Sequence, residues 1–158
     1  MFYGSSKKHY FKKTIKCTHN DQKKQKISNL NMLFIAKIES RLDVVLYRSK
    51  FCWSINIARQ IIKHGKVKVN NRIIKSKFYI LKPGDFISIK KSMFFKLDRI
   101  NKQLGWKKNT WPHTPRHLFL NYKTLQIIFN NPNNENFASS LTFNLKLEKI
   151  LLNYLKTQ

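Results

Sequence analysis

The chain has 158 residues, which is enough for one domain or for one small domain with extensions. It carries 32 Lys and Arg against 7 Asp and Glu, a formal net charge of +25, and an apolar fraction of 42% that allows a modest core. This composition excludes a chain that is disordered throughout, and such an excess of like charge repels itself unless a polyanion neutralises it.

The sequence also argues against a membrane protein, a secreted protein and a metal-binding protein. No apolar run approaches the roughly 18–20 residues that cross a bilayer, and the longest covers only residues 32–36. We expect no secretory signal and, with Met1 present, no cleaved import presequence. Cys17 and Cys52 are too few for a disulfide framework and indicate a reducing compartment. Only two histidines lie near Cys17, so we expect no metal site.

Residues 1–30 combine lysine pairs with aromatic residues and show no helical or strand period. A segment of this kind is disordered in isolation. We therefore expect a basic N-terminal arm that lies on nucleic acid or on neighbouring proteins.

A helical pattern follows the arm. One apolar stripe is formed at spacings of three and four by Ile35, Ile38, Leu42, Val45 and Leu46. The helix begins either with a capping box, Ser40-x-x-Asp43, or earlier with residue 28 or 29 as its cap, and both starts remain open. Residues 49–50 end it.

A second, shorter helix is predicted from Ile55 to His64, with Ser54 as its N-cap and Gly65 as its stop. Phe51 and Trp53 should pack under the preceding turn. The buried face of this second helix consists of Ile57, Ala58, Ile61 and Ile62. Its other side carries Arg59, Gln60, Lys63 and His64.

Short strands with tight turns come next. Residues 66–69 alternate lysine with valine, so one face of this strand is apolar and the other cationic. Asn70-Asn71 suits a hairpin turn that leads into a return strand at 72–74. A second turn at 82–85 precedes a last strand at 86–89.

These elements predict an α+β module, two helices with a small antiparallel sheet, whose cations share one edge. No acidic residue lies between Ile55 and Lys82 to offset them. An edge of this kind can follow phosphates while helix side chains sit against an RNA groove or junction.

Three blocks of the module, ESRLDVVLYR, ARQIIKHGKVKVNN and KPGDFISI, resemble the RNA-binding module of the ribosomal small-subunit protein S-four family. The same module occurs in pseudouridine synthases, tyrosyl-tRNA synthetases, some RNA methyltransferases and a ribosome-associated heat-shock protein. The flanks NLNMLFIAKIESRLD and PRHLFLNYKTLQIIFNNP resemble the segments before and after the module in the ribosomal family, the second being a strand pair. The resemblance covers about residues 30–132 and is strongest over 39–89.

The resemblance implies a structural constituent of the small ribosomal subunit that organises 5′-domain rRNA during assembly and translation, near the mRNA entrance. The implied partners are small-subunit rRNA, neighbouring small-subunit proteins and, as a further option, mRNA; no cofactor, membrane or small-molecule substrate is implied. The alternative is a trans-acting RNA-binding factor of the heat-shock type. We expect no enzyme, because a glycine-rich phosphate loop, a methyl-donor site and a nucleophile arrangement are all missing from the sequence.

Carried over position by position, the resemblance implies RNA contacts by Arg41, Arg59, Gln60, Lys63, His64, Lys66, Lys68 and Asn70. Our predicted RNA-binding set also includes Arg48, Lys50, Ser54, Arg72 and Lys77. Asp43 is expected to be structural, pairing with a cation or holding the helix start. Two positions depart from the family pattern, with Ile55 where arginine is usual and Asn71 where glycine is usual.

We divide the chain into a basic arm at 1–30, the module with its leading helix at 31–92, and a C-terminal part at 93–158 that packs on the module and on neighbouring ribosomal proteins. In the last part, residues 94–104 suggest a short helix or strand, and residues 141–155 a strand then a helix or one helix.

The location is inferred from the whole sequence. Lysine, asparagine, isoleucine and phenylalanine are abundant, which indicates A/T-rich codons, and the flanks look like organellar members of the family. We therefore expect a mitochondrial ribosome in the matrix, with a plastid-type organelle as second choice.

Overall fold

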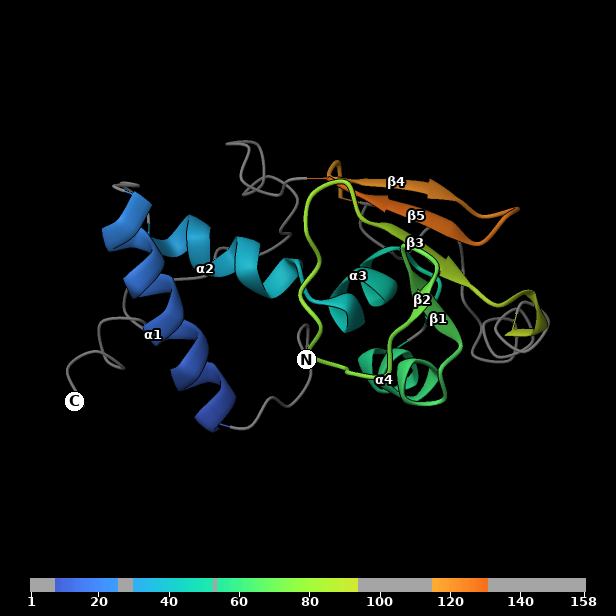
Figure 1. The fold of residues 1–158 in the computed structure, drawn as a ribbon, viewed down its shortest axis with the longest axis horizontal. Coiled ribbons are helices and arrows are strands. Elements are labelled where there is room, and N and C mark those ends of the chain that lie inside the picture. The colour runs from blue at the N-terminus through green and yellow to red at the C-terminus, as the bar shows by residue number, and fades with distance from the viewer. Residues whose placement is uncertain (1–7, 26–29, 53, 94–114, 131–158) are drawn as a thin grey trace.

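The computed structural model describes residues 8–25, 30–52, 54–93 and 115–130. Two helices, α1 (Lys8–Gln25) and α2 (Leu30–Glu39), lie at one end of the molecule, and α2 leads into a packed α+β unit at the other end (Figure 1). That unit contains α3 (Leu42–Arg48), α4 (Ile55–Lys63) and an antiparallel sheet. The predicted α+β class is therefore confirmed.

Helix α1 corrects the prediction of an arm without regular structure. Its buried residues Thr14, Ile15 and Thr18 lie on one side of the helix, and α1 packs beside α2 (Figure 1). An ion pair of 2.7 Å between Lys37 Nζ and Asp21 Oδ2 joins the two helices. So few apolar positions give a weak period in the sequence, and a tertiary partner decides the conformation instead. The domain division at residue 30 stays a prediction.

The predicted leading helix is broken at residues 40–41. Ser40 does not cap a helix, because its hydroxyl donates to the Ala36 carbonyl at 2.6 Å, and Arg41 is extended at the N-cap position of α3. The backbone here bonds sideways to a later segment, with Leu42 N donating to Tyr79 O and Leu81 N donating to Ser40 O. The predicted capping box is therefore wrong, since these long-range bonds take the place of helix continuation.

The second helix and the first hairpin match their predictions closely. Ser54 Oγ accepts from Ile57 N at 3.3 Å, and α4 ends one residue earlier than predicted, before Gly65 with its φ of +65°. The hairpin consists of β1 (Val67–Val69) and β2 (Arg72–Ile73). Its two asparagines, Asn70 and Asn71, have φ values of 47° and 65°, the left-handed region that the tight turn requires.

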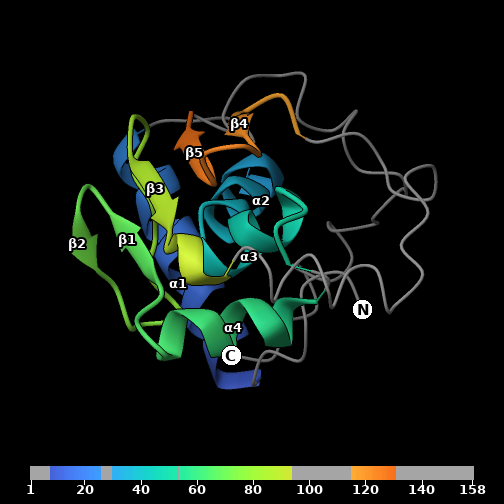
Figure 2. The same ribbon diagram turned by 90° about the vertical axis from the view of Figure 1, so that its right-hand side faces the viewer.

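The sheet has five strands in the order β2-β1-β3-β5-β4. Strand β3 (Phe86–Ile89) has the predicted bounds, and the 3₁₀ turn η1 (Lys91–Met93) follows it. The predicted C-terminal strand pair is confirmed as β4 (Leu118–Asn121) and β5 (Gln126–Phe129), and β5 pairs with β3. Figure 2 shows the sheet bending around α3, with α4 beside β1.

The hydrophobic core joins α3, α4 and the strands β1, β3, β4 and β5. Leu118, Leu125, Ile127 and Phe129 from the C-terminal hairpin are buried in the same cluster as Leu46 and Ile62. Phe51 is also buried, as predicted, and its ring lies 5.3 Å from that of Tyr122. The hairpin is therefore an integral part of this core.

Some predictions lie outside the described residues, namely those for Trp53, residues 94–104 and residues 141–155. Among the residues that the structure describes, no helix is both long enough and apolar enough to span a membrane.

Candidate nucleic-acid interface

The acidic side chains of the α+β unit are directed inward. From residue 30 to 93 the chain has three of them, and Glu39, Asp43 and Asp85 are exposed by only 0%, 0% and 8%. Glu39 lies 3.3 Å from Arg48 Nε, while Asp85 accepts hydrogen bonds from Asn70 Nδ2 and from a backbone amide. No carboxylate of residues 30–93 is therefore exposed to offset the lysines on the surface of this region.

Asp43 links α3, α4 and the extended residue between α2 and α3. Its Oδ1 accepts from Arg41 Nε at 3.1 Å and from Val44 N at 3.0 Å. Its Oδ2 accepts from an Arg41 terminal nitrogen at 2.7 Å and from Arg59 Nε at 2.9 Å. A fully buried carboxylate is stable only with such partners. The prediction that Asp43 is structural, pairing with cations at the helix start, is confirmed.

Two predicted RNA contacts are buried. Arg41 is exposed by 2% and Arg48 by 3%, and each pairs with an interior carboxylate. Their burial contradicts direct contact with RNA. We therefore correct their role to structural ion pairing, in which Arg48 joins α3 to the end of α2 and Arg41 joins the extended residue to α3. Arg41 also lies 5.2 Å from the centre of the Phe78 ring.

The exposed cations begin on the outer side of α4. Gln60, Lys63 and His64 are exposed there, and Arg59 contributes a side chain that is 15% exposed while it pairs with Asp43. The α4–β1 turn then presents Lys66. The structure thus brings together the predicted residues of helix and turn on one side of the unit.

The first hairpin adds further cations. Lys68 is the outward residue of β1, between the inward Val67 and Val69. Arg72 is exposed at the start of the edge strand β2, on the same face of the sheet as its partner Val69. A Cβ added at Gly65 would lie 3.7 Å from Lys75 Cε, which places Lys75 beside the α4–β1 turn. We had not predicted Lys75 as a contact, although its position in the acid-free stretch was a usable signal.

We name this set the cationic surface. Its members are Arg59, Gln60, Lys63, His64, Lys66, Lys68, Arg72 and Lys75. Ammonium and guanidinium groups over an acid-free area bind phosphates through charge-assisted hydrogen bonds, and a neighbouring amide or imidazole can bind base edges or sugar hydroxyls.

Four other predicted contacts lie apart or already have structural partners. Ser54 uses its hydroxyl as the N-cap of α4, and Asn70 donates to Asp85 and accepts from Phe86 N at 2.9 Å. Lys50, with a φ of 64°, lies beyond the end of α3. Lys77 Nζ lies 5.0 Å from the centre of the Phe78 ring.

Two side chains with shifted pKa values, Cys52 and His117, lie in the interior and not on the cationic surface. Burial raises the pKa of the Cys52 thiol to about 12. Burial, together with the charge of Arg48, lowers the pKa of His117 to about 4. Among the described residues, no group of three or more His, Cys, Asp or Glu could hold a metal ion.

Comparison with known proteins agrees with this geometry. The family described as S4 domain matches residues 40–87, from the start of α3 into β3. The small ribosomal subunit protein uS4 of Brucella anthropi is 37% identical over 89 residues, which is 56% of this chain and 41% of that protein. The uS4 proteins of Maricaulis maris and Brucella ovis are 35% and 37% identical over the same length. The chain thus covers less than half the length of these bacterial relatives. The predicted S-four-type module is confirmed.

Proposed function

We propose that this chain, which carries an S4 domain and is similar to uS4 proteins, is a uS4-type structural constituent of the small ribosomal subunit. Its role is to bind and organise small-subunit rRNA, and its other partners are neighbouring small-subunit proteins. The observation that carries this proposal is the cationic surface, which lies on the S4 domain, where residues 40–87 have no exposed carboxylate.

The mechanism is recognition of RNA shape by a rigid cationic face. Lys63 and Lys66 bind phosphates on two sides of the α4–β1 turn, while Gln60 and His64 lie one helical turn away from each other and reach groove edges. The Asp43 network holds α4 against α3, so these groups keep fixed positions. A multi-helix junction in the 5′ domain is the kind of target that such a face fits, because several phosphate strands converge there.

The finer proposals concern location and contact with mRNA. The A/T-rich codon usage that the composition implies supports a mitochondrial ribosome, with a plastid-type organelle as second choice. The relatives themselves are bacterial. A position near the mRNA entrance is part of the same proposal. The relatives are ribosomal proteins, so they favour neither an enzyme nor the alternative of a trans-acting factor.

The test uses the full chain and a small-subunit rRNA fragment that contains the 5′-domain junction. The double variant Lys63→Glu and Lys66→Glu should bind this RNA much more weakly, with a slope of log K against log salt about two units shallower. Arg59 is left unchanged, because a glutamate there would meet the buried Asp43 carboxylate and disturb folding.

The matched control is Lys12→Glu with Lys16→Glu, which makes the same charge change at exposed positions of α1. Because α1 belongs to the basic arm, this control should lose some affinity, but much less than the Lys63 and Lys66 double variant on the S4 domain. Equal losses in both double variants, with thermal melting unchanged, would mean that the cationic surface has no special role.

A further inference from the structure

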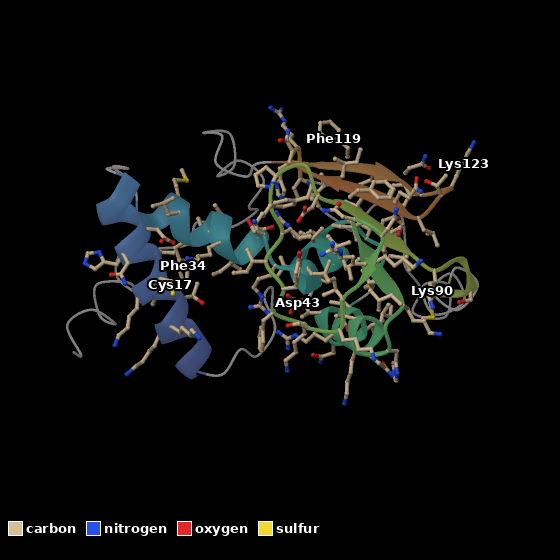
Figure 3. All side chains as sticks on the ribbon, viewed as in Figure 1. Cys17, Phe34, Asp43, Lys90, Phe119 and Lys123 are labelled. Atoms are coloured by element: carbon tan, nitrogen blue, oxygen red, sulfur yellow. The ribbon has the colours of Figure 1, made fainter. Side chains whose placement is uncertain are left out.

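A row of apolar side chains crosses the outer face of the sheet. Phe86 pairs with Ile128, and Ile128 pairs with Phe119, so the three side chains share one face across β3, β5 and β4. Phe119 is 57% exposed, Ile128 is 46% exposed and Phe86 is partly exposed. Figure 3 shows Phe119 on the side of β4 away from α3.

The next position on each strand points the other way, into the core. Ile87 and Ile127 pair with each other and are fully buried. The exposed row is therefore a separate feature and not the edge of the core. Neighbouring strands lie about 4.8 Å apart, so Phe86 and Phe119, two strands apart, are separated by roughly 10 Å. Each ring has room for its own planar ligand.

Exposed cations border the row at both strand ends. Lys82 and Arg116 precede the strands that carry the two phenylalanines, whereas Lys90 follows β3 and Lys123 lies in the β4–β5 turn. Figure 3 shows Lys90 and Lys123 toward the same end of the sheet. Residues 115–130 contain no acidic residue.

The adjoining row is polar. Ser88 pairs with Lys68 on one side and with Gln126 on the other. Lys68 thereby connects this face with the cationic surface. A hydroxyl, an amide and an ammonium group are thus available beside the aromatic rings for hydrogen bonds to bases or to phosphates.

We infer that the outer face of the sheet binds single-stranded RNA, with one base stacked on Phe119 and another on Phe86, while the bordering lysines and Arg116 contact phosphates. Flat aromatic faces on a sheet are suited to unpaired bases, which stack on them with little regard to sequence. Charge complementarity favours a nucleic acid over a protein segment, since exposed cations surround the row and the described strands present no exposed carboxylate. The inference rests on the proposed RNA-binding function but concerns a different surface and a different form of RNA.

The first measurement is ultraviolet crosslinking of the full chain to a single-stranded oligouridine, followed by trypsin digestion and mass spectrometry. Cleavage after Arg116 and Lys123 releases the peptide His117–Lys123, which contains two exposed rings, Phe119 and Tyr122. We expect a uridine adduct on Phe119. An adduct confined to Tyr122, or no adduct on this peptide, overturns the inference.

The second measurement is the affinity for the same oligouridine at about 0.2 M salt, where electrostatic binding is weakened. Phe119→Leu keeps an apolar side chain but loses the ring, and it should weaken binding by about 5- to 150-fold. Phe119→Tyr should bind like the unchanged protein. The control Ile80→Ala removes a 45% exposed apolar side chain outside the sheet and should leave the affinity unchanged.

The structured rRNA fragment separates this inference from the proposed function. Phe119→Leu should bind the fragment nearly as well as the unchanged protein, whereas the Lys63 and Lys66 double variant should not. If Phe119→Leu keeps full affinity for oligouridine, single-stranded RNA does not stack on this face, as expected for a docking site for another protein, and the inference fails. If the lysine double variant still binds the rRNA fragment, the proposed function fails, whatever the result at Phe119.

Discussion

At the scale of single residues, Asp43 determines how the arginines of this unit are used. The sequence led us to expect a structural role for Asp43 and an RNA contact for Arg41, yet the two side chains bind each other. The error has a physical reason. Arg41 lies two residues away on an extended segment, and its position relative to Asp43 depends on the backbone bonds that hold that segment to residues 79–81.

Removing the Asp43 carboxylate should destabilise the fold strongly. In Asp43→Ala, Arg41 and most of Arg59 would stay buried without their anionic partner, which costs about 3–5 kcal/mol in the free energy of unfolding. Urea denaturation followed by circular dichroism measures this loss. Asp21→Ala, which breaks the partly exposed pair with Lys37, is the control and should cost at most about 1 kcal/mol. Equal losses in the two variants would contradict the central role of the Asp43 network.

His117 should make the stability depend on pH. Its pKa is lowered from 6.5 to about 4 by burial and by the charge of Arg48, so the folded state favours the neutral imidazole. The stabilisation is complete above pH 6.5 and is lost as the pH falls toward 4, by on the order of 2–3 kcal/mol. Unfolding free energies measured across this range should fall more steeply for the unchanged protein than for His117→Gln. Parallel curves would show that His117 does not titrate in this way.

At the scale of secondary-structure elements, local signals located some helices and strands and missed others. The cap at Ser54, the stop at Gly65 and the two asparagines of the hairpin each act within a few residues, so α4 and the β1–β2 hairpin could be predicted from sequence. The break between α2 and α3 could not, because residues 40–41 bond to a segment about forty positions later. Helix α1 was missed because its conformation depends on packing against α2.

The two turn asparagines have different roles, and their glycine variants should show it. Both have positive φ, which glycine adopts without strain, so Asn71→Gly should leave the stability unchanged or raise it slightly. Asn70→Gly loses the bonds to Asp85 Oδ1 and from Phe86 N, and we expect a loss of about 1–3 kcal/mol. Thermal melting of the two variants measures the difference. A result in which Asn71→Gly is the more damaging change would contradict this assignment.

At the scale of the whole molecule, the folded unit is larger than its S4 domain. The domain match ends at residue 87, but Ile127 and Phe129 of β5 fill the same core, and Tyr122 donates to Ser49 O at 3.2 Å. The strand pair was expected from the resemblance of its segment to the ribosomal family. Its place beside β3 could not be predicted, because sheet order is decided by packing between distant segments.

The distribution of charged groups between surface and interior becomes clear only in the folded structure. The sequence shows an excess of cations, and the fold shows that the carboxylates of residues 30–93 are buried, so the cationic surface of the S4 domain has no exposed carboxylate within residues 40–87. Of the predicted RNA contacts, Arg41 and Arg48 are buried in the interior, whereas those of the cationic surface stay predictions. The burial of these two arginines depends on how distant segments of the chain pack together, which the sequence did not reveal.

The most direct test of the central claim is to crosslink the protein to RNA in its native cells and to sequence the attached RNA. Our account predicts crosslinks concentrated in a junction of the 5′ domain of small-subunit rRNA, and the rRNA sequence itself identifies whether the ribosome is mitochondrial, plastid-type or bacterial. Crosslinks concentrated in large-subunit rRNA or in tRNA would contradict the account, because a structural protein of the small subunit has no stable place on either.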